Sequence, residues 1–175
     1  GWYLTDEMLD FFVRARLKDP SMFMLVLTPR DHEKLAASLA ERGVGPEDFM
    51  IRSVSPSDVP KYLAASDVAI SFIKACYSKQ SSSPTKIAEY LALGLPVISN
   101  SGVGDLDSLI EGNKLGVILS DLTTTGYDAG LAQLDVLLTD QTLRERCAKV
   151  AAERFDLGRV AGERYRRMYS KLLNG

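Results

Sequence analysis

Short runs of apolar residues alternate along this chain with longer stretches in which apolar residues recur every three or four positions. The short runs are typical of buried β-strands, and the longer stretches are typical of amphipathic helices. The short runs predict strands over residues 22–27, 49–51, 67–73, 95–99 and 116–119. The longer stretches predict helices over about 8–19, 31–42, 57–65, 84–93, 126–138, 140–152 and 156–173.

The alternation of strands and helices determines the predicted fold class. Strands and helices joined by loops of a few residues are typical of parallel β–α–β units, whose sheets are covered by helices. Gly43 and Gly94 stand where two of the helices should end, and Pro96 forbids continuation of the second. We therefore predict an α/β fold with a single Rossmann-like domain over residues 1–175, a parallel sheet with helices on both faces. Ligands of such folds bind beyond the carboxyl ends of the strands.

Composition narrows the classes of function. The chain of 175 residues is 46% hydrophobic and 25% charged, ordinary values for one globular domain. Its net charge of -2 and pI of about 5.5 argue against a nucleic-acid partner. The two cysteines are expected to be reduced and buried, as in a cytoplasmic protein, and the single His32 argues against a His/Cys metal site. Because the chain starts at Gly1 rather than Met, we expect a part of a longer protein.

The candidate chemistry is concentrated between Ser81 and Val103. Ser83 suits a helix N-cap and Pro84 the first helical position, so the backbone N–H groups that follow should point outward. A helix N-terminus of this kind attracts anions. Lys86 lies in the first turn, where the helix dipole disfavours a cation unless an anion neutralises it. This pattern predicts a diphosphate-binding site, and a solvated lysine at the start of a surface helix is the alternative.

Glu89 is the acidic residue of the same predicted helix. It follows Thr85 by four positions and Lys86 by three, so the three residues share one face. Its neighbours are apolar, which places the carboxylate either on a narrow exposed strip or in a pocket, where it would accept two hydrogen bonds from a ribose diol. Gly102 and Gly104 follow the next strand and allow either close approach of a ligand or a tight turn.

Residues 83–100 carry a family resemblance. Their sequence, Ser-Pro-Thr-Lys-Ile-Ala-Glu-Tyr-Leu-Ala-Leu-Gly-Leu-Pro-Val-Ile-Ser-Asn, resembles the signature of the group 1 glycosyltransferases, retaining enzymes of the two-Rossmann-domain B fold. The run at 54–70, Val-Ser-Pro-Ser-Asp-Val-Pro-Lys-Tyr-Leu-Ala-Ala-Ser-Asp-Val-Ala-Ile, is similar to a second family pattern. The resemblance aligns the whole chain with the C-terminal, donor-binding domain. It implies that the N-terminal acceptor domain lies outside this chain, which alone should bind donor weakly and transfer little.

The resemblance also implies roles for single residues. Glu89 would hold the ribose hydroxyls of the donor and, with Lys86, forms the candidate catalytic pair. The nucleotide and its diphosphate would be contacted by Arg52, Val54, Ser82, Ser83, Thr85, Lys86 and Glu89, and the donor sugar by Ser81 and Ser82.

Two departures from the family pattern qualify these roles. Ser81 stands where the family has its first Glu, a contact of the donor sugar, so the identity of the sugar is open. The start of the chain lacks the Arg/Lys pair that neutralises the diphosphate, and we expect Lys86 or Arg52 to take that role.

The resemblance implies transfer of a sugar from a nucleoside diphosphate sugar, with UDP the expected nucleotide, to a glycan, lipid-linked or other acceptor with retention. N–H donors and Lys86 would stabilise the leaving diphosphate, so that neither metal nor cofactor is required. Such activity belongs to polysaccharide and cell envelope biosynthesis. Two other interpretations stay open, a non-catalytic sugar-nucleotide-binding or scaffolding domain and a non-hydrolysing nucleotide-sugar epimerase.

The last predicted helix is basic and amphipathic, and three interpretations fit it. Its apolar residues either pack on this domain, cross to the missing Rossmann domain, or touch an anionic membrane. We therefore expect a cytoplasmic protein for which peripheral contact with the inner face of the membrane stays open. Trp2 and Tyr3 are interpreted as core or as a domain interface rather than as a platform for sugar stacking.

Overall fold

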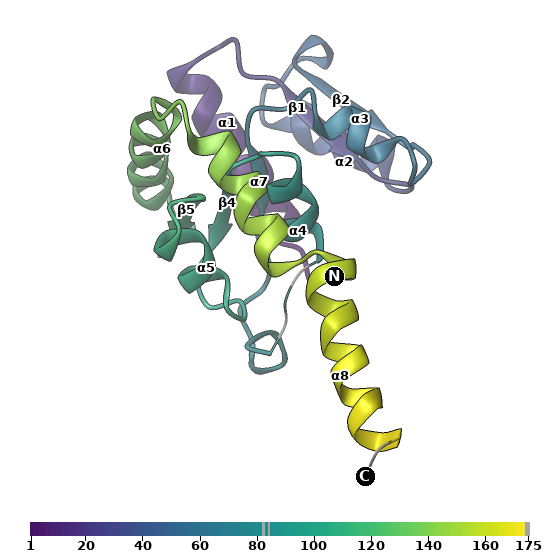
Figure 1. The fold of residues 1–175 in the computed structure, drawn as a ribbon. Helices are drawn as coiled ribbons and strands as arrows, with labels where there is room; N and C mark the ends of the chain where they lie inside the picture. Colours follow the sequence, from purple (N-terminus) through teal and green to yellow (C-terminus); the bar gives the residue numbers. More distant parts are fainter. Residues whose placement is uncertain (82, 84, 174–175) are drawn as a thin grey trace.

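The computed structural model describes residues 1–81, 83 and 85–173 (Figure 1). The helices are α1 (Thr5–Lys18), α2 (His32–Glu41), α3 (Val59–Leu63), α4 (Thr85–Ala92), α5 (Leu106–Gly112), α6 (Thr124–Leu138), α7 (Leu143–Arg154) and α8 (Gly162–Leu173). The strands are β1 (Met24–Leu27), β2 (Phe49–Arg52), β3 (Ala69–Ser71), β4 (Val97–Asn100) and β5 (Gly116–Leu119). Short helical turns lie at η1 (Pro46–Asp48), η2 (Tyr77–Lys79) and η3 (Leu157–Ala161).

All strand pairs are parallel, which confirms the predicted α/β class. The strands form two sheets, however, where the sequence predicts one. One sheet pairs β1 with β2, and the other has the order β3-β4-β5. Near the carboxyl end of β3, Tyr3 forms an isolated antiparallel bridge with Ile73.

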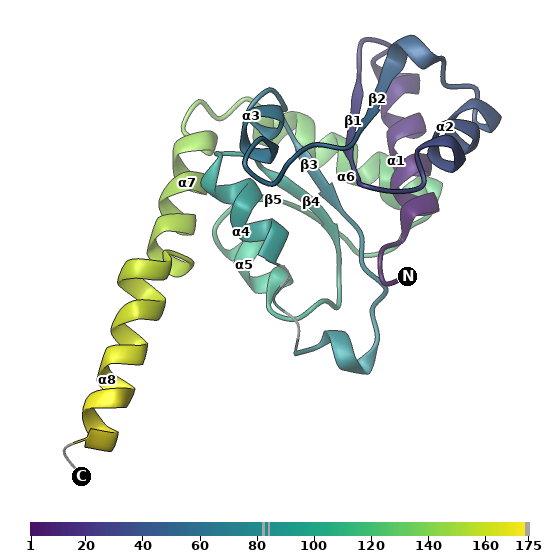
Figure 2. The ribbon, with the colours of Figure 1, turned by 90° about the vertical axis from the view of Figure 1, so that its right-hand side faces the viewer.

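Helices cover both faces of the three-stranded sheet, as predicted (Figure 2). One face packs on residues of α4, α5 and α7. The other packs on α1 and α6, where the ring of Phe11 meets those of Phe72 and Tyr127 edge to face at centroid distances of 5.7 and 5.5 Å. Leu9 and Phe12 of α1 belong instead to the apolar cluster of the β1–β2 sheet. Helix α1 therefore contacts both sheets.

The ends of two helices follow the predicted signals. Gly43 after α2 and Gly94 after α4 both take the left-handed conformation, with φ of 78° and 75°. The amide of Gly94 donates to the carbonyl of Leu91 and that of Leu95 to the carbonyl of Tyr90, which satisfies the last carbonyls of the helix.

One helix was not predicted from the sequence. Helix α5 has seven residues, and its apolar residues Leu106, Leu109 and Ile110 are buried at a helical spacing. Two full helical turns give too short a period to stand out beside a glycine-rich loop. The predicted strands over 22–27 and 67–73 are also shorter in the structure, where they are β1 and β3.

The C-terminal helix departs from the interpretation in which its apolar residues pack on this domain. The predicted helix over 156–173 is divided into η3 and α8. Helix α8 contacts η3 and projects away from the rest of the molecule (Figures 1 and 2). Its apolar side chains are exposed, namely those of Tyr165, Met168, Tyr169, Leu172 and Leu173. Among the described residues, none of the five belongs to the three apolar clusters of the domain, although Tyr165 and Met168 line a cavity beside Phe155.

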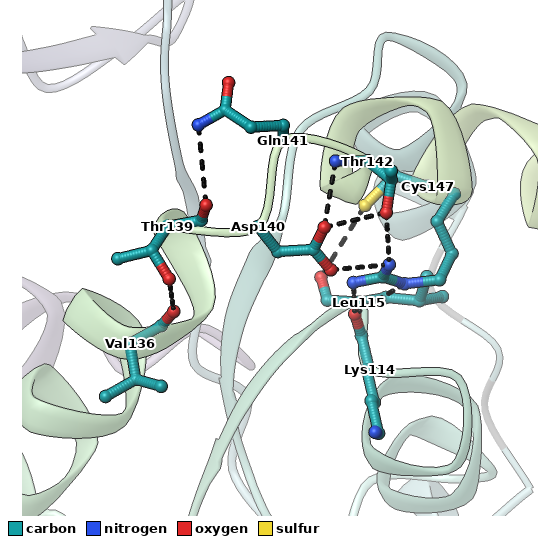
Figure 3. A network of polar contacts seen from close by, with 9 residues as sticks. Lys114, Leu115, Val136, Thr139, Asp140, Gln141, Thr142 and Cys147 are labelled. Carbon is teal, nitrogen blue, oxygen red and sulfur yellow. Dashed lines mark hydrogen bonds and ion pairs between the residues drawn. The ribbon is translucent and has the colours of Figure 1, made fainter.

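A polar network fixes the turn between α6 and α7 (Figure 3). The carboxylate of Asp140 accepts hydrogen bonds from the hydroxyl and the amide of Thr142, at 2.7 and 2.9 Å, and pairs with Arg146 at 2.8 Å. These contacts, the Thr142 hydroxyl first, lower the pKa of Asp140 to about 2. Arg146 also donates to the carbonyl of Lys114, and so ties this turn to the one before β5. Nearby Cys147 is buried, whereas Cys76 is half-exposed, and both are free thiols, so the expectation of two buried cysteines holds for Cys147 alone.

Candidate functional site

The carboxyl ends of β3 and β4 are held together by a buried side chain, Asn100. Its Oδ1 accepts from the amide of Ile73 at 2.8 Å, and its Nδ2 donates to the carbonyl of Ile73 at 2.9 Å and to that of Ser101 at 3.1 Å. One residue earlier, the Ser99 hydroxyl donates to the carbonyl of Ser71. These bonds continue the pairing of the two strands beyond the last strand residue and fix where the loop after β3 leaves the sheet. Asn100 was not predicted as a site residue, although a lone amide at the end of an apolar strand is a signal for such a role.

The loops after β3 and β4 lie against each other. The amide of Gly104 donates to the carbonyl of Lys79 at 2.9 Å. Gly102, at φ 81°, approaches so closely that an added Cβ would lie 3.3 Å from the Cβ of Ala75. The amide of Gly102 donates to Asp107 Oδ2, while Oδ1 of this carboxylate is buried without a hydrogen-bond partner among the described residues. Both glycines have a positive φ, 81° for Gly102 and 53° for Gly104, which fits the tight-turn interpretation, and both also make contacts between the loops.

Helix α4 as described begins at Thr85, one residue after the predicted start. Thr85 and Lys86 are exposed, as are Ser81 and Ser83. Ser82 and Pro84 lie outside the described residues. The described residues that were predicted to contact the diphosphate and the donor sugar therefore lie exposed at a helix N-terminus, at the carboxyl edge of the sheet.

Two lysines at this edge contact aromatic rings from the start of the chain. The Lys86 ammonium lies 4.7 Å from the ring centroid of Tyr3, and that of Lys79 lies 4.4 Å from the ring of Trp2. Contacts of this kind stabilise by only about 0.5–1 kcal/mol at exposed sites. Lys79 was not predicted as a site residue, and its only sequence signal is a basic side chain in a polar loop. Trp2 and Tyr3 are half-exposed, so they are not part of the core.

Glu89 lines a cavity between α3 and α4. The cavity has a volume of about 350 Å³, and its other walls are the side chains of Pro56, Val59, Pro60, Leu63, Ala92 and Leu93. Glu89 itself is exposed, so its carboxylate stands at the mouth of an otherwise apolar cavity. This volume is near the lower limit for small-molecule sites. Both interpretations of Glu89 thus hold in part, because the side chain is exposed and also lines a pocket.

Tyr90 follows Glu89 and is half-buried. Burial raises the pKa of Tyr90 to about 12, and the neighbouring Tyr3 and Glu89 add to the rise. Its hydroxyl therefore stays protonated at neutral pH and cannot act as a base there.

The segment predicted to meet the nucleobase leads into α3. The Arg52 guanidinium lies 5.8 Å from the ring of Tyr62 on that helix, and Val54 is half-buried. The structure thus brings the segment that follows Val54 to the cavity of Glu89, because Pro56 and Val59 form part of its wall. Arg52 and Lys86 are held by different aromatic rings.

Within residues 1–81, 83 and 85–173, no three His, Cys, Asp or Glu side chains are grouped as a metal site requires. Among the helices that the structure describes, none combines the length and the apolar character needed to cross a membrane.

Comparison with solved structures identifies the fold of this chain. No sequence profile of a known family and no curated protein sequence matches the chain. Among solved structures, the pneumococcal O-GlcNAc transferase GtfA in complex with UDP and GlcNAc has a TM-score of 0.76 at 14% identity, over 99% of this chain and 34% of its own. WaaG, a glycosyltransferase involved in lipopolysaccharide biosynthesis, has a TM-score of 0.64 at 20% identity, over 87% of this chain and 39% of its own. Sucrose-phosphate synthase from Thermosynechococcus elongatus has a TM-score of 0.69 at 15% identity, over 98% of this chain and 44% of its own.

These similarities establish the architecture. The chain has the Rossmann-like fold of one half of a GT-B glycosyltransferase, which confirms the predicted resemblance at the level of fold. It spans between 34% and 44% of the length of these three structures. At sequence identities of 14 to 20%, these similarities show the fold of this chain and not its activity.

Proposed function

We propose that this chain is the donor-binding half of a retaining glycosyltransferase that uses a nucleoside diphosphate sugar, with UDP the expected nucleotide. The observation that carries the proposal is the position of Glu89 at the mouth of the apolar cavity between α3 and α4. A nucleoside offers an apolar base and a polar ribose diol. The walls formed by Pro56, Val59 and Pro60 suit the base, and the carboxylate suits the diol, from which it accepts two hydrogen bonds.

The start of α4 supports the second part of the proposal, stabilisation of the leaving diphosphate. When the anomeric C–O bond breaks, negative charge develops on the diphosphate. Free N–H groups of the first helical turn and the Lys86 ammonium are donors of the required sign. Lys86 leaves the ring of Tyr3 readily, because a charge-assisted bond to phosphate is stronger than an exposed cation–π contact. In this proposal Ser81, Ser82, Ser83 and Thr85 surround the diphosphate and sugar, and no metal is required.

The acceptor is proposed to bind to a second Rossmann-like domain of the same polypeptide. Helix α8 supports this part, because it projects from the domain with Tyr165, Met168 and Tyr169 exposed. Peripheral contact of α8 with an anionic membrane is the other use of the same face. Sedimentation of the full-length protein with vesicles of anionic and of neutral lipid distinguishes the two, since only membrane contact depends on lipid charge.

The proposal is tested by Glu89→Ala in a calorimetric titration with UDP and with uridine. Loss of two charge-assisted hydrogen bonds should weaken both ligands by at least about 100-fold, because both carry the ribose. Glu111→Ala, an exposed glutamate on α5, is the matched control and should leave both affinities unchanged. Unchanged UDP affinity for Glu89→Ala in a folded protein would show that the ribose is held elsewhere.

A non-catalytic sugar-nucleotide-binding domain is the second candidate. It is favoured by Ser81, an exposed hydroxyl where the resemblance expects a carboxylate that contacts the sugar. Both candidates bind the nucleotide, so the test that separates them is turnover. The full-length protein is incubated with UDP-, GDP-, ADP- and CMP-linked sugars and an acceptor mixture, and release of nucleotide is measured. Release with transfer supports the enzyme, epimerisation of the donor sugar supports the epimerase alternative, and tight binding without either supports the binding domain.

A further inference from the structure

The carboxyl edge of the sheets carries positive charge that the described carboxylates do not neutralise. Several basic side chains on the helices have carboxylate partners, as Lys18 has in Asp135 and Arg42 in Asp10. Among the described residues, no carboxylate pairs with the basic side chains at the ends of β1, β2 and β3 or in the first turn of α4, namely Arg30, Arg52, Lys74, Lys79 and Lys86. Because ligands of this fold bind at the carboxyl edge, charge of this sign suits an anion.

Lys79 differs from the other four cations in its surroundings. It is half-buried, whereas Arg30, Arg52, Lys74 and Lys86 are exposed. Partial removal from water disfavours an ammonium group that no carboxylate neutralises, and a bound anion offsets that cost. Lys79 is therefore the cation of this edge that gains most from an anionic ligand.

The loop after β4 fixes the backbone of Lys79. The carbonyl of Lys79 accepts a hydrogen bond from the amide of Gly104 at 2.9 Å, and Gly102 approaches Ala75 closely in the same pair of loops. The side chain of Lys79 therefore starts from a defined place beyond the carboxyl ends of β3 and β4.

Lys79 and Lys86 contact two consecutive residues, Trp2 and Tyr3. The Lys79 ammonium lies 4.4 Å from the centroid of the Trp2 ring, and the Lys86 ammonium lies 4.7 Å from that of Tyr3. The Cα atoms of consecutive residues are about 3.8 Å apart, so both ammonium groups lie beside one short segment of backbone. The carbonyl of Trp2 accepts from the amide of Lys74, which holds this segment at the end of β3.

One lysine has less positive charge than the diphosphate of the proposed ligand has negative charge. A nucleoside diphosphate sugar has one negative charge on each of its two phosphates, and the released nucleotide gains most of another, because its terminal phosphate has a second pKa of about 6. Lys86 contributes one positive charge, and the N-terminus of α4 contributes about half an elementary charge. A second ammonium group brings the positive charge of the site close to that of the released nucleotide in magnitude.

We propose that Lys79 is the second cation of the diphosphate site. On binding, both ammonium groups exchange aromatic rings for charge-assisted hydrogen bonds to phosphate oxygens. Lys79 contacts the diphosphate from the loop after β3, and Lys86 contacts it from the start of α4. This inference rests on the proposed function, because the nucleoside diphosphate is the ligand of that function.

The first test is a calorimetric titration of the full-length protein with UDP and with uridine. Lys79→Ala should weaken UDP on the order of tenfold and uridine by less than about twofold, because only UDP carries the diphosphate. Lys79→Met keeps the aliphatic chain without the charge and should lose as much UDP affinity as Lys79→Ala, whereas Lys79→Arg should lose less. Unchanged UDP affinity in both Lys79→Ala and Lys79→Met would overturn the proposal.

The matched control is Lys74→Ala, which removes an exposed lysine of the same loop and should leave both affinities unchanged. An equal loss of UDP affinity in Lys74→Ala and Lys79→Ala would show that the loop acts through its overall charge, and would overturn the contact assigned to Lys79.

Failure of this inference is distinguishable from failure of the proposed function. If the nucleotide is not bound at this site, Glu89→Ala leaves the affinities for both UDP and uridine unchanged. If Glu89→Ala and Lys86→Ala weaken UDP while Lys79→Ala does not, the nucleotide site stands and the second cation alone is refuted.

The second test uses Trp2, the only tryptophan of this chain, as a reporter. The part of the fluorescence of the full-length protein that Trp2→Phe removes belongs to Trp2. Saturating UDP should change this part, because it draws the Lys79 ammonium away from the indole ring, and saturating uridine should not. In Lys79→Met the response to saturating UDP should be absent. A response that persists in Lys79→Met, or no response in the unaltered protein, would contradict the proposal.

Discussion

Asn100→Ala provides the sharpest test of how the sheet positions the site. The side chain has 6% of its surface exposed and satisfies both backbone groups of Ile73, which is itself 5% exposed. Alanine removes both partners and leaves a buried N–H and a buried C=O unsatisfied. At about 1–3 kcal/mol for each such group, the free energy of unfolding should fall by about 2–6 kcal/mol. For a chain of 175 residues this corresponds to a decrease in Tm of roughly 4–24 °C.

The matched control is Asn113→Ala. The side chain of Asn113 donates one hydrogen bond, from Nδ2 to the carbonyl of Leu109, and is only half-buried. Asn113→Ala should therefore lower the free energy of unfolding by about 0.5–1.5 kcal/mol. Urea unfolding followed by circular dichroism measures both variants. If Asn100→Ala lowers the free energy of unfolding by no more than Asn113→Ala does, the clamp on Ile73 does not fix the end of β3.

Asn100→Asp adds a test of direction. Aspartate keeps the acceptor for the Ile73 amide but points a second oxygen at the Ile73 carbonyl, which the native Nδ2 serves as a donor. The variant should be less stable than wild type at neutral pH and should recover as the pH falls, because the protonated acid donates again. Stability that is independent of pH relative to wild type would contradict this geometry.

Three further outcomes are expected. Gly116→Ala should abolish folding, because its Cβ would collide with the carbonyl of Val97 in the paired strand, whereas Gly112→Ala, with open space around it, should leave the midpoint of urea unfolding unchanged or higher. The stability that Asp140→Asn removes should be fully present above the ordinary carboxyl pKa of 3.8 and vanish as the pH falls through about 2, because the folded pKa is lowered; a constant difference across acid unfolding curves would contradict this. Lys86→Ala should weaken UDP by roughly 10- to 100-fold and uridine by less than about twofold, with Lys34→Ala as the unaffected control, and equal losses for both ligands would exclude a phosphate contact.

Much of the fold was predictable because burial leaves a periodic record in the sequence. The apolar runs at β1 and β5 and the helical spacing of α2, α6 and α7 predict their elements within a few residues. The glycine caps at Gly43 and Gly94 are local, because a glycine directly after a helical pattern readily takes the left-handed conformation. The seven residues of α5 leave too short a record to be recognised.

The candidate site was predictable only as a set of residues, not as an arrangement. Periodicity places Lys86 and Glu89 on one face of a helix. In the structure, however, Lys86 contacts the ring of Tyr3, whereas Glu89 lines the cavity between α3 and α4. These partners lie far away in the sequence. The pairing of Lys79 with Trp2 was missed for the same reason, since nothing local distinguishes that lysine.

The sequence by itself determined the α/β class, the parallel character of its strands and the helix whose start bears Lys86, because these follow from the periodicity of each element and from the alternation of strands and helices along the chain. Only the tertiary structure decided that Asn100 clamps Ile73, that α1 spans two sheets and that β1 and β3 are edge strands in the part of the chain that the structure describes. The physical reason is that strand pairing joins residues about 19 to 28 positions apart, such as Val97 with Gly116 and Ala69 with Val97, and local periodicity carries no information about such neighbours.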